Sequence, residues 1–283
     1  MIEANGVELC TEPFGDPADP PILLVMGTGA SMLRWEEGFC WMLAHAGRFV
    51  IRYDHRDTGR SVTYEPGHPE YTGADLVADA AGVLDAYDIP AAHIVGTSAG
   101  GAFAQLLALD YPARVLSLVL ISTSRALPGE RGLPPPTEVF TRFVTTAEVD
   151  RSHSESVIEY LVDYSRLLAG GQRPFDETAA RELVHRDLER ARNFSSAQNH
   201  DSIPDDGRTH GPLSSISAPT LVLHGTADPM FPLEHGDALA AEIPDARLLT
   251  LEGGGHGVDR ADWQTVVGAI TEHTARAGEL RRG

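Results

Sequence analysis

The residues His93-Ile94-Val95-Gly96-Thr97-Ser98-Ala99-Gly100 decide the fold of this chain. A short apolar run ends at a G-x-S-x-G motif, and residues 101–109 continue with the apolar spacing of a buried helix. Strand, sharp turn and helix in this order are typical of a nucleophile elbow, in which a strained backbone exposes a serine oxygen at the tip of the strand. The flanking glycines leave room where the two elements approach too closely for a Cβ. We interpret Ser98 as a nucleophile, and a flexible Gly-Ser turn is the alternative.

The basic residues of the chain are unusual, because all 22 of them are arginine and the sequence contains no lysine. A Schiff-base enzyme, a Ser-Lys hydrolase and a pyridoxal enzyme are therefore excluded, since each needs an amine. A P-loop also needs a lysine, and no G-x-G-x-x-G follows the first predicted strands. Histidine is then the expected base for Ser98.

Two later loops carry the residues that a serine nucleophile requires. In proteins built on such an elbow, the acid and the histidine follow the serine in chain order, each after a later strand. Residues 220–225 form a β-rich run that leads into a turn with Asp228, the candidate acid. Residues 246–251 are the next predicted strand, and the glycine-rich loop after them carries His256, the candidate base. His256 would take the serine proton, and Asp228 would fix its tautomer by a hydrogen bond.

The negative charge that develops on the carbonyl oxygen needs preorganised donors, which backbone amides can supply. One predicted donor is the N–H of Ala99, directly after the nucleophile. The second is predicted at Thr28, in the Met26-Gly27-Thr28-Gly29 loop that follows the apolar strand 22–25. An ordinary strand-end turn is the alternative for this loop.

The order of elbow, Asp-Pro loop and Gly-Gly-Gly-His loop resembles the α/β-hydrolase superfamily over nearly the whole chain. The segments 14–20, 24–27 and 51–61 are more narrowly similar to the aclacinomycin methylesterase group, which hydrolyses a methyl ester on an aromatic polyketide glycoside. The resemblance implies the triad Ser98, Asp228 and His256, with oxyanion amides at Thr28 and Ala99. The group has Gly where Thr28 stands and Met where Ala99 stands. Backbone donation survives both changes, but the shape of the pocket differs.

Alternating strand and helix patterns from about Val7 to Ser122 predict an α/β fold with a mostly parallel central sheet and helices on both faces. We expect one hydrolase core made of residues 1–122 and 216–283, interrupted by a helical cap at 123–215. Helical periodicity within the insertion covers about 137–146, 154–168 and 176–193. The cap would lie over the carboxyl ends of the strands and determine substrate specificity.

Several side chains are candidates for the substrate pocket. Gly27 lies in the predicted oxyanion loop, and Trp35 and Met230 follow that loop and the acid, so we predict these residues near Ser98. Apolar cap residues either line the pocket or simply dock the helices, and docking is the favoured interpretation. These cap residues are Phe140, Phe143, Tyr160, Leu161, Tyr164, Leu167 and Leu168.

The charged run Asp54-His55-Arg56-Asp57-Thr58-Gly59-Arg60-Ser61 resembles a catalytic or metal cluster at first sight. We interpret it as a structural loop whose acids and arginines satisfy one another. No histidine pair has the H-E-x-x-H spacing, so no metal is expected. Cys10 and Cys40 are not clustered and are expected to be reduced and partly buried.

The net charge of −19, from 41 acidic and 22 basic residues, would repel a phosphate-rich partner, so nucleic acid is not expected. No apolar segment is long enough to cross a membrane, and no signal peptide is recognised, so we expect a cytoplasmic protein without membrane association. No cofactor is required by the predicted chemistry. A monomer and a homodimer are equally compatible with the sequence.

These observations predict a serine esterase that acts on a small-molecule carboxylic ester, with no cofactor or metal. A methyl ester on a bulky cyclic natural product is one substrate that the resemblance implies. A lactonase or a cofactor-free peroxidase or perhydrolase on the same triad is an alternative. A ligand-binding protein that keeps the fold without turnover is a further alternative from another class.

Overall fold

The computed structural model describes residues 1–127, 132–151, 153–204 and 207–280. In this described part of the chain, seven strands form one sheet in the order β3-β5-β4-β6-β7-β8-β9. Only the edge strand β3 runs antiparallel to its neighbour, and the other pairs are parallel. The strands are β3 (Thr11–Phe14), β4 (Pro21–Val25), β5 (Phe49–Tyr53), β6 (Ala92–Thr97), β7 (Val115–Ile121), β8 (Thr220–Gly225) and β9 (Arg247–Leu251). The elbow strand β6 lies in the middle of this order.

A separate two-stranded hairpin of β1 (Ile2–Ala4) and β2 (Val7–Leu9) precedes the sheet. Its register pairs Ala4 with Val7, so Asn5 and Gly6 form the connecting turn. Both residues have positive φ, at 49° and 75°, which is the geometry of a type I′ turn.

Helices cover both faces of the sheet. Alternate residues of each buried strand point to opposite faces, so both faces carry apolar side chains that the helices bury. On β4, for example, Leu23 belongs to one apolar cluster and Ile22 and Leu24 belong to the other. The first cluster packs against α2 (Gly73–Ala86), α3 (Ala99–Asp110) and α7 (Glu234–Glu242). The second packs against α1 (Glu37–His45) and α8 (Trp263–Leu280). The predicted α/β architecture is confirmed.

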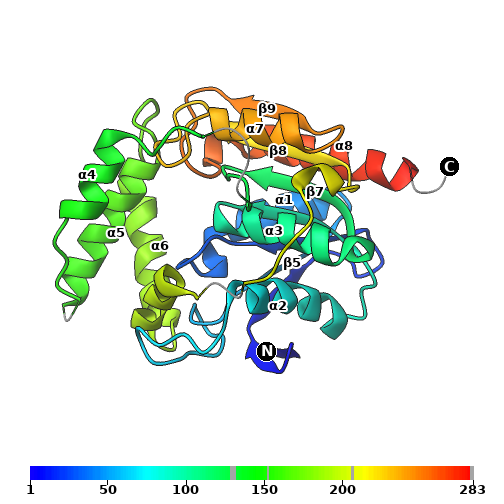
Figure 1. Cartoon of the computed structure of the whole chain (residues 1–283). Helices are drawn as coiled ribbons and strands as arrows, with labels where there is room; N and C mark the ends of the chain where they lie inside the picture. The colour runs from blue at the N-terminus through cyan, green and yellow to red at the C-terminus, as the bar shows by residue number, and fades with distance from the viewer. Residues whose placement is uncertain (128–131, 152, 205–206, 281–283) are drawn as a thin grey trace.

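Although β7 and β8 pair directly in the sheet, the described chain between them contains three further α-helices, which are α4 (Glu138–Thr146), α5 (Ser154–Leu168) and α6 (Glu177–Arg190). They form a group at one side of the sheet (Figure 1). Their bounds agree with the helical segments predicted for the insertion. Residues 128–131, 152 and 205–206 of the predicted insertion lie outside the described residues.

The α5–α6 pair encloses a small apolar cluster of its own, which is centred on Ile158, Val162 and Val184. Stacked rings of Phe143 and Tyr160, with centroids 5.4 Å apart, join α4 to α5. The three helices therefore hold one another largely by their own packing.

Candidate active site

Ser98 occupies the sharp turn between β6, which ends at Thr97, and α3, which begins at Ala99. Its φ of 52° and ψ of −129° put a non-glycine residue in a strained region of backbone space. The glycines on either side are required by close contacts. A Cβ on Gly96 would lie 2.3 Å from the Gly100 carbonyl oxygen, and one on Gly100 would lie 2.3 Å from the Val25 carbonyl oxygen. The motif therefore forms the elbow that the sequence predicts.

The surrounding structure holds the strained serine in place through hydrogen bonds to both its backbone N–H and its backbone carbonyl. The Ser98 N–H donates to the Ile121 carbonyl at 3.0 Å, and Thr123 Oγ1 donates to the Ser98 carbonyl at 2.6 Å. The side chain remains partly exposed. An exposed oxygen on a fixed backbone is what a nucleophile requires.

Asp228 and His256 come together from the loops that follow β8 and β9. Asp228 Oδ2 lies 2.9 Å from His256 Nδ1, and Asp228 Oδ1 accepts the N–H groups of Met230 and Phe231 at 2.9 Å each. Burial alone would raise the pKa of Asp228, but its hydrogen bonds with His256 and with the Phe231 N–H bring the pKa below its ordinary value. The carboxyl group is therefore an ionised acceptor that orients the His256 ring.

A second histidine, His224 at the end of β8, supports the acid and was not singled out from the sequence. Its Nε2 lies 2.7 Å from the Phe231 carbonyl oxygen and 3.6 Å from Asp228 Oδ2. Burial lowers the pKa of His224, so the ring is neutral and donates its Nε2–H to Phe231. His224 thus braces the turn that carries the acid.

The Met26–Gly29 loop lies directly against the elbow. A Cβ on Gly27 would be 3.1 Å from the Ser98 Cβ and 3.5 Å from its Oγ. Among the residues that the structure describes, the N–H groups of Thr28 and Ala99 have no acceptor within the protein. Two unpaired amides beside an exposed serine oxygen are suited to bind an oxyanion.

Within residues 1–127 and 207–280, no hydrogen bond joins Ser98 Oγ to His256. Such contacts commonly tighten only when a substrate is bound. The side chain of His256 is 7% exposed, and its ring lies 5.6 Å from the ring of Phe231. The His256 side chain is thus enclosed, while Ser98 stays partly exposed.

The predicted pocket residues fall in different environments. Trp35 is buried, with its ring stacked 5.8 Å from that of Phe39 in the apolar cluster on the α1 side. Met230 is half-buried, and its amide is used by Asp228. Gly27 lies against Ser98, as described above. Substrate contact by these residues stays a prediction.

A groove of about 1090 Å³ lies beside the acid turn, between the insertion helices and α7. Phe143 and Leu167 of the predicted cap residues line it, together with Asp228. Phe140, by contrast, is buried. Burial and the neighbouring Tyr160 raise the pKa of Tyr164 to about 12, with Asp228 among the charges that contribute. The aromatic residues of α4 and α5 therefore pack the two helices together, and Phe143 also lines the groove beside the acid.

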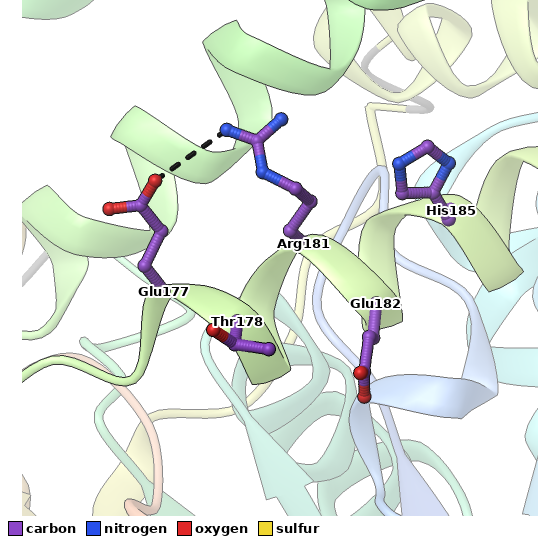
Figure 2. A pocket seen from close by; sticks show the side chains of 5 residues that line it. All are labelled: Glu177, Thr178, Arg181, Glu182 and His185. Carbon is purple, nitrogen blue, oxygen red and sulfur yellow. Dashed lines mark ion pairs between the residues drawn. The ribbon is translucent and has the colours of Figure 1, made fainter.

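A smaller hollow of about 350 Å³ is lined by Glu177, Thr178, Arg181, Glu182 and His185. All five side chains come from α6 (Figure 2), and Glu177 pairs with Arg181 at 3.6 Å. No candidate triad residue lines it. It is a feature of one helix surface.

The charged loop 54–61 is structural, but the expectation that its charges satisfy one another is wrong. Arg56 makes two hydrogen bonds of 2.7 Å to Asp79 on α2. Asp57 accepts from Tyr71 and from Asn199 at 2.8 Å each. Within the loop the Arg60 N–H donates to Asp54 Oδ2, whereas the side chains of Arg56 and Asp57 bond to the elements packed around the loop.

Among the helices described, none combines the length and the apolar character that a membrane crossing needs. In the same residues, histidine, cysteine and carboxylate side chains do not gather in groups of three or more that would bind a metal ion. Cys10 and Cys40 are both buried and unbridged, and burial raises the pKa of the Cys40 thiol to about 12.

The strand order, the elbow and the paired loops define an α/β hydrolase, and a model of the alpha/beta hydrolase fold family matches residues 20–258. The chain belongs to this family. It is 38% identical over 294 aligned positions to the rhodomycin D methylesterase DauP of Streptomyces sp. strain C5, with 98% of each chain covered. It is 31% identical to the putative carbamate hydrolase RutD of Caulobacter vibrioides strain NA1000 / CB15N, with 86% of each chain covered.

A solved structure, the esterase RhEst1 from Rhodococcus sp. ECU1013, superposes with a TM-score of 0.76 over 97% of each chain at 23% identity. At this identity the likeness shows the fold. The family and the relatives at higher identity establish the class of the protein, which is a carboxylic ester hydrolase.

Proposed function

We propose that Ser98, His256 and Asp228 form a catalytic triad that cleaves a methyl ester on a bulky cyclic natural product. The observation that carries the proposal is the Asp228–His256 hydrogen bond of 2.9 Å, formed by the loops after β8 and β9. The elbow serine stands at the end of β6 in the same parallel sheet. Carboxyl ends of parallel strands meet at one edge, where such sheets bind ligands.

The chemistry follows from these positions. Ser98 Oγ attacks the ester carbonyl while His256 Nε2 takes its proton. The oxyanion accepts hydrogen bonds from the amides of Thr28 and Ala99. Collapse of the tetrahedral intermediate expels the alcohol, which takes the proton from His256. Water then attacks the acyl-enzyme, with His256 again as base, and His256 returns the proton to Ser98 Oγ as the carboxylic acid leaves.

The assignment of a methyl ester as the substrate is supported by the similarity to DauP, a rhodomycin D methylesterase that matches 98% of this chain. Residues 123–215 are proposed as a cap that selects this substrate, between core segments 1–122 and 216–283. The groove of about 1090 Å³ beside the acid turn has the volume of a ligand pocket, and Asp228 is the candidate triad residue that lines it.

Methanol release tests the proposal directly, with methyl esters of a one-ring and a four-ring carboxylic acid as substrates. We expect kcat/KM to be at least about tenfold higher for the four-ring ester, and Ser98→Ala to abolish both reactions. Equal rates for the two esters would contradict selection of a bulky acid. Adding hydrogen peroxide tests the perhydrolase alternative, because a preference for water during deacylation excludes it.

A further inference from the structure

The loop that carries the Thr28 amide is held at both ends by buried histidine side chains. His55 Nε2 lies 2.8 Å from the Met26 carbonyl oxygen, before the amide. His200 Nδ1 lies 2.7 Å from the Gly29 amide nitrogen, after it. The two rings are 6.1 Å apart and meet edge to face. The protein therefore grips the backbone on each side of the predicted oxyanion donor.

The hydrogen bonds fix the tautomer of each ring. A backbone N–H can only donate, so His200 Nδ1 accepts from Gly29, and its Nε2–H donates to the Arg56 carbonyl 2.8 Å away. A carbonyl can only accept, so His55 donates its Nε2–H to Met26. Burial lowers the pKa of His200 to about 4 and also lowers the pKa of His55, which keeps both rings neutral.

The two histidine contacts add hydrogen bonds to a loop that is otherwise held by the packing of Gly27 against Ser98 and of Met26 against the second apolar cluster. The loop contains two glycines, and Gly29 has a φ of 70°. Thr28 is exposed, so its side chain is not packed into the protein. Glycine loses more backbone freedom on ordering than other residues. Oxyanion stabilisation depends on donors that are already in place when charge develops.

We propose that His200 is a positioning residue that fixes the Thr28 amide for oxyanion binding by accepting the Gly29 N–H. His200 lies in the segment Phe194–Ser202, which follows α6 and is far from the loop in sequence. The insertion thus acts on the chemistry as well as on substrate choice, because it supplies this contact. The inference rests on the proposed function, since it requires Thr28 to be an oxyanion donor.

Two substitutions separate the hydrogen bonds of His200. The side-chain oxygen in His200→Asn reaches the position of Nδ1 and can still accept from Gly29. The side-chain nitrogen in His200→Gln reaches the position of Nε2 and can still donate to Arg56. His200→Ala removes both contacts. The Asn and Gln variants are therefore a matched pair in which only one retains the proposed function of the ring.

Three measurements are made on each variant: kcat and KM for p-nitrophenyl butyrate, Ki for an aliphatic trifluoromethyl ketone, and hydrogen exchange of the Gly29 amide by NMR. We expect His200→Gln and His200→Ala to lower kcat about 10- to 100-fold with little change in KM. This decrease in kcat is smaller than the decrease of about 100- to 1000-fold that follows when an oxyanion donor is removed outright. The ketone, which forms an oxyanion on Ser98, should bind more weakly by a similar factor. His200→Asn should stay within about threefold of wild type and keep the Gly29 amide protected.

The inference is overturned if His200→Asn is as impaired as His200→Gln while both are folded in thermal unfolding. It is also overturned if all variants keep wild-type kcat and ketone affinity. Failure of the proposed function looks different, because the wild type would then neither turn over the ester nor bind the ketone. In that case Gly29 exchange in the Asn and Gln variants still decides whether His200 holds the loop.

Discussion

Replacing Asp228 by asparagine changes one atom of the candidate triad, and the contacts of Asp228 determine which way the new side-chain amide faces. Asp228 Oδ1 accepts two backbone N–H groups at 2.9 Å, so the nitrogen of the new amide cannot face them. The nitrogen must therefore take the place of Oδ2, 2.9 Å from His256 Nδ1. His256 is then forced to accept at Nδ1 and to carry its proton at Nε2. In that tautomer it cannot take the proton of Ser98.

The expected loss follows from this exchange of tautomers. In enzymes with a Ser-His-Asp triad the same substitution leaves the geometry intact and lowers kcat about 10⁴-fold. This factor corresponds to about 5.5 kcal/mol in the activation free energy. We expect a loss of this order in Asp228→Asn, with the fold preserved because the shape of the side chain is unchanged.

The assay is kcat for p-nitrophenyl butyrate, with thermal unfolding followed by circular dichroism. Asp88→Asn is the matched control, since Asp88 is exposed after the end of α2, does not line the groove, and its loss changes the net charge equally. The control should keep wild-type activity. If Asp228→Asn retained more than about a tenth of wild-type kcat, His256 would not depend on Asp228 for its tautomer.

Three further predictions concern stability and packing. A Cβ on Gly255 would lie 2.1 Å from a carbonyl oxygen at the end of α5, so Gly255→Ala should lower the free energy of unfolding by about 1–3 kcal/mol and reduce kcat. Gly268 has open space around it, so Gly268→Ala should be neutral or stabilising in the same unfolding assay. Equal behaviour of the two variants would contradict the close packing at Gly255. Asp79→Ala leaves Arg56 buried without its partner and should cost about 3–5 kcal/mol in urea unfolding, and a cost below about 1 kcal/mol would show that the pair is not needed. The pKa of His200 is about 4 in the folded protein, against about 6.5 when unfolded. Neutral His200 therefore contributes about 3 kcal/mol to the free energy of unfolding above pH 6.5, and this contribution is lost as the pH falls toward 4. This part of the pH dependence of stability should be missing in His200→Gln, and identical pH profiles of the variant and the wild type would refute the prediction.

The parts of the fold that the sequence predicts are those with a strong local pattern. The elbow is one continuous segment, in which strand, glycines and helix follow one another within a few residues. The helices of the insertion show clear periodicity, and their observed bounds agree with it. Asp228 and His256 were identified because each follows a recognisable strand. Their hydrogen bond could be expected from the parallel order of β8 and β9, since both loops leave the same edge.

The supporting histidines are not predictable in the same way. His200 lies 171 residues from Gly29 in sequence, and nothing in its neighbourhood marks it as a partner of that loop. His55 was placed in a structural loop, but the direction of its ring depends on the tertiary packing. The partners of Arg56 and Asp57 were missed for a related reason. Charge alternation along a loop does not reveal which elements surround it once it is buried.

The apolar residues of α4 and α5 show a third limit of sequence-based prediction. An apolar stripe on a helix predicts that the stripe is covered, but not by what. Phe140 is buried, whereas Phe143 and Leu167 line the groove, although all three fit the same helical spacing. Only the placement of α4 and α5 beside the acid turn distinguishes them.

The central claim is that Ser98 is a nucleophile activated by His256, and covalent labelling tests it most directly. Wild type and Ser98→Ala are treated with a p-nitrophenyl alkylphosphonate, and the adduct is located by mass spectrometry of the peptides. We predict one adduct, on Ser98, in the wild type and none in Ser98→Ala. Labelling should be strongly slowed in His256→Ala, because the imidazole is needed to take the serine proton. An unlabelled wild type, or an adduct that persists in Ser98→Ala, would contradict the assignment of the nucleophile.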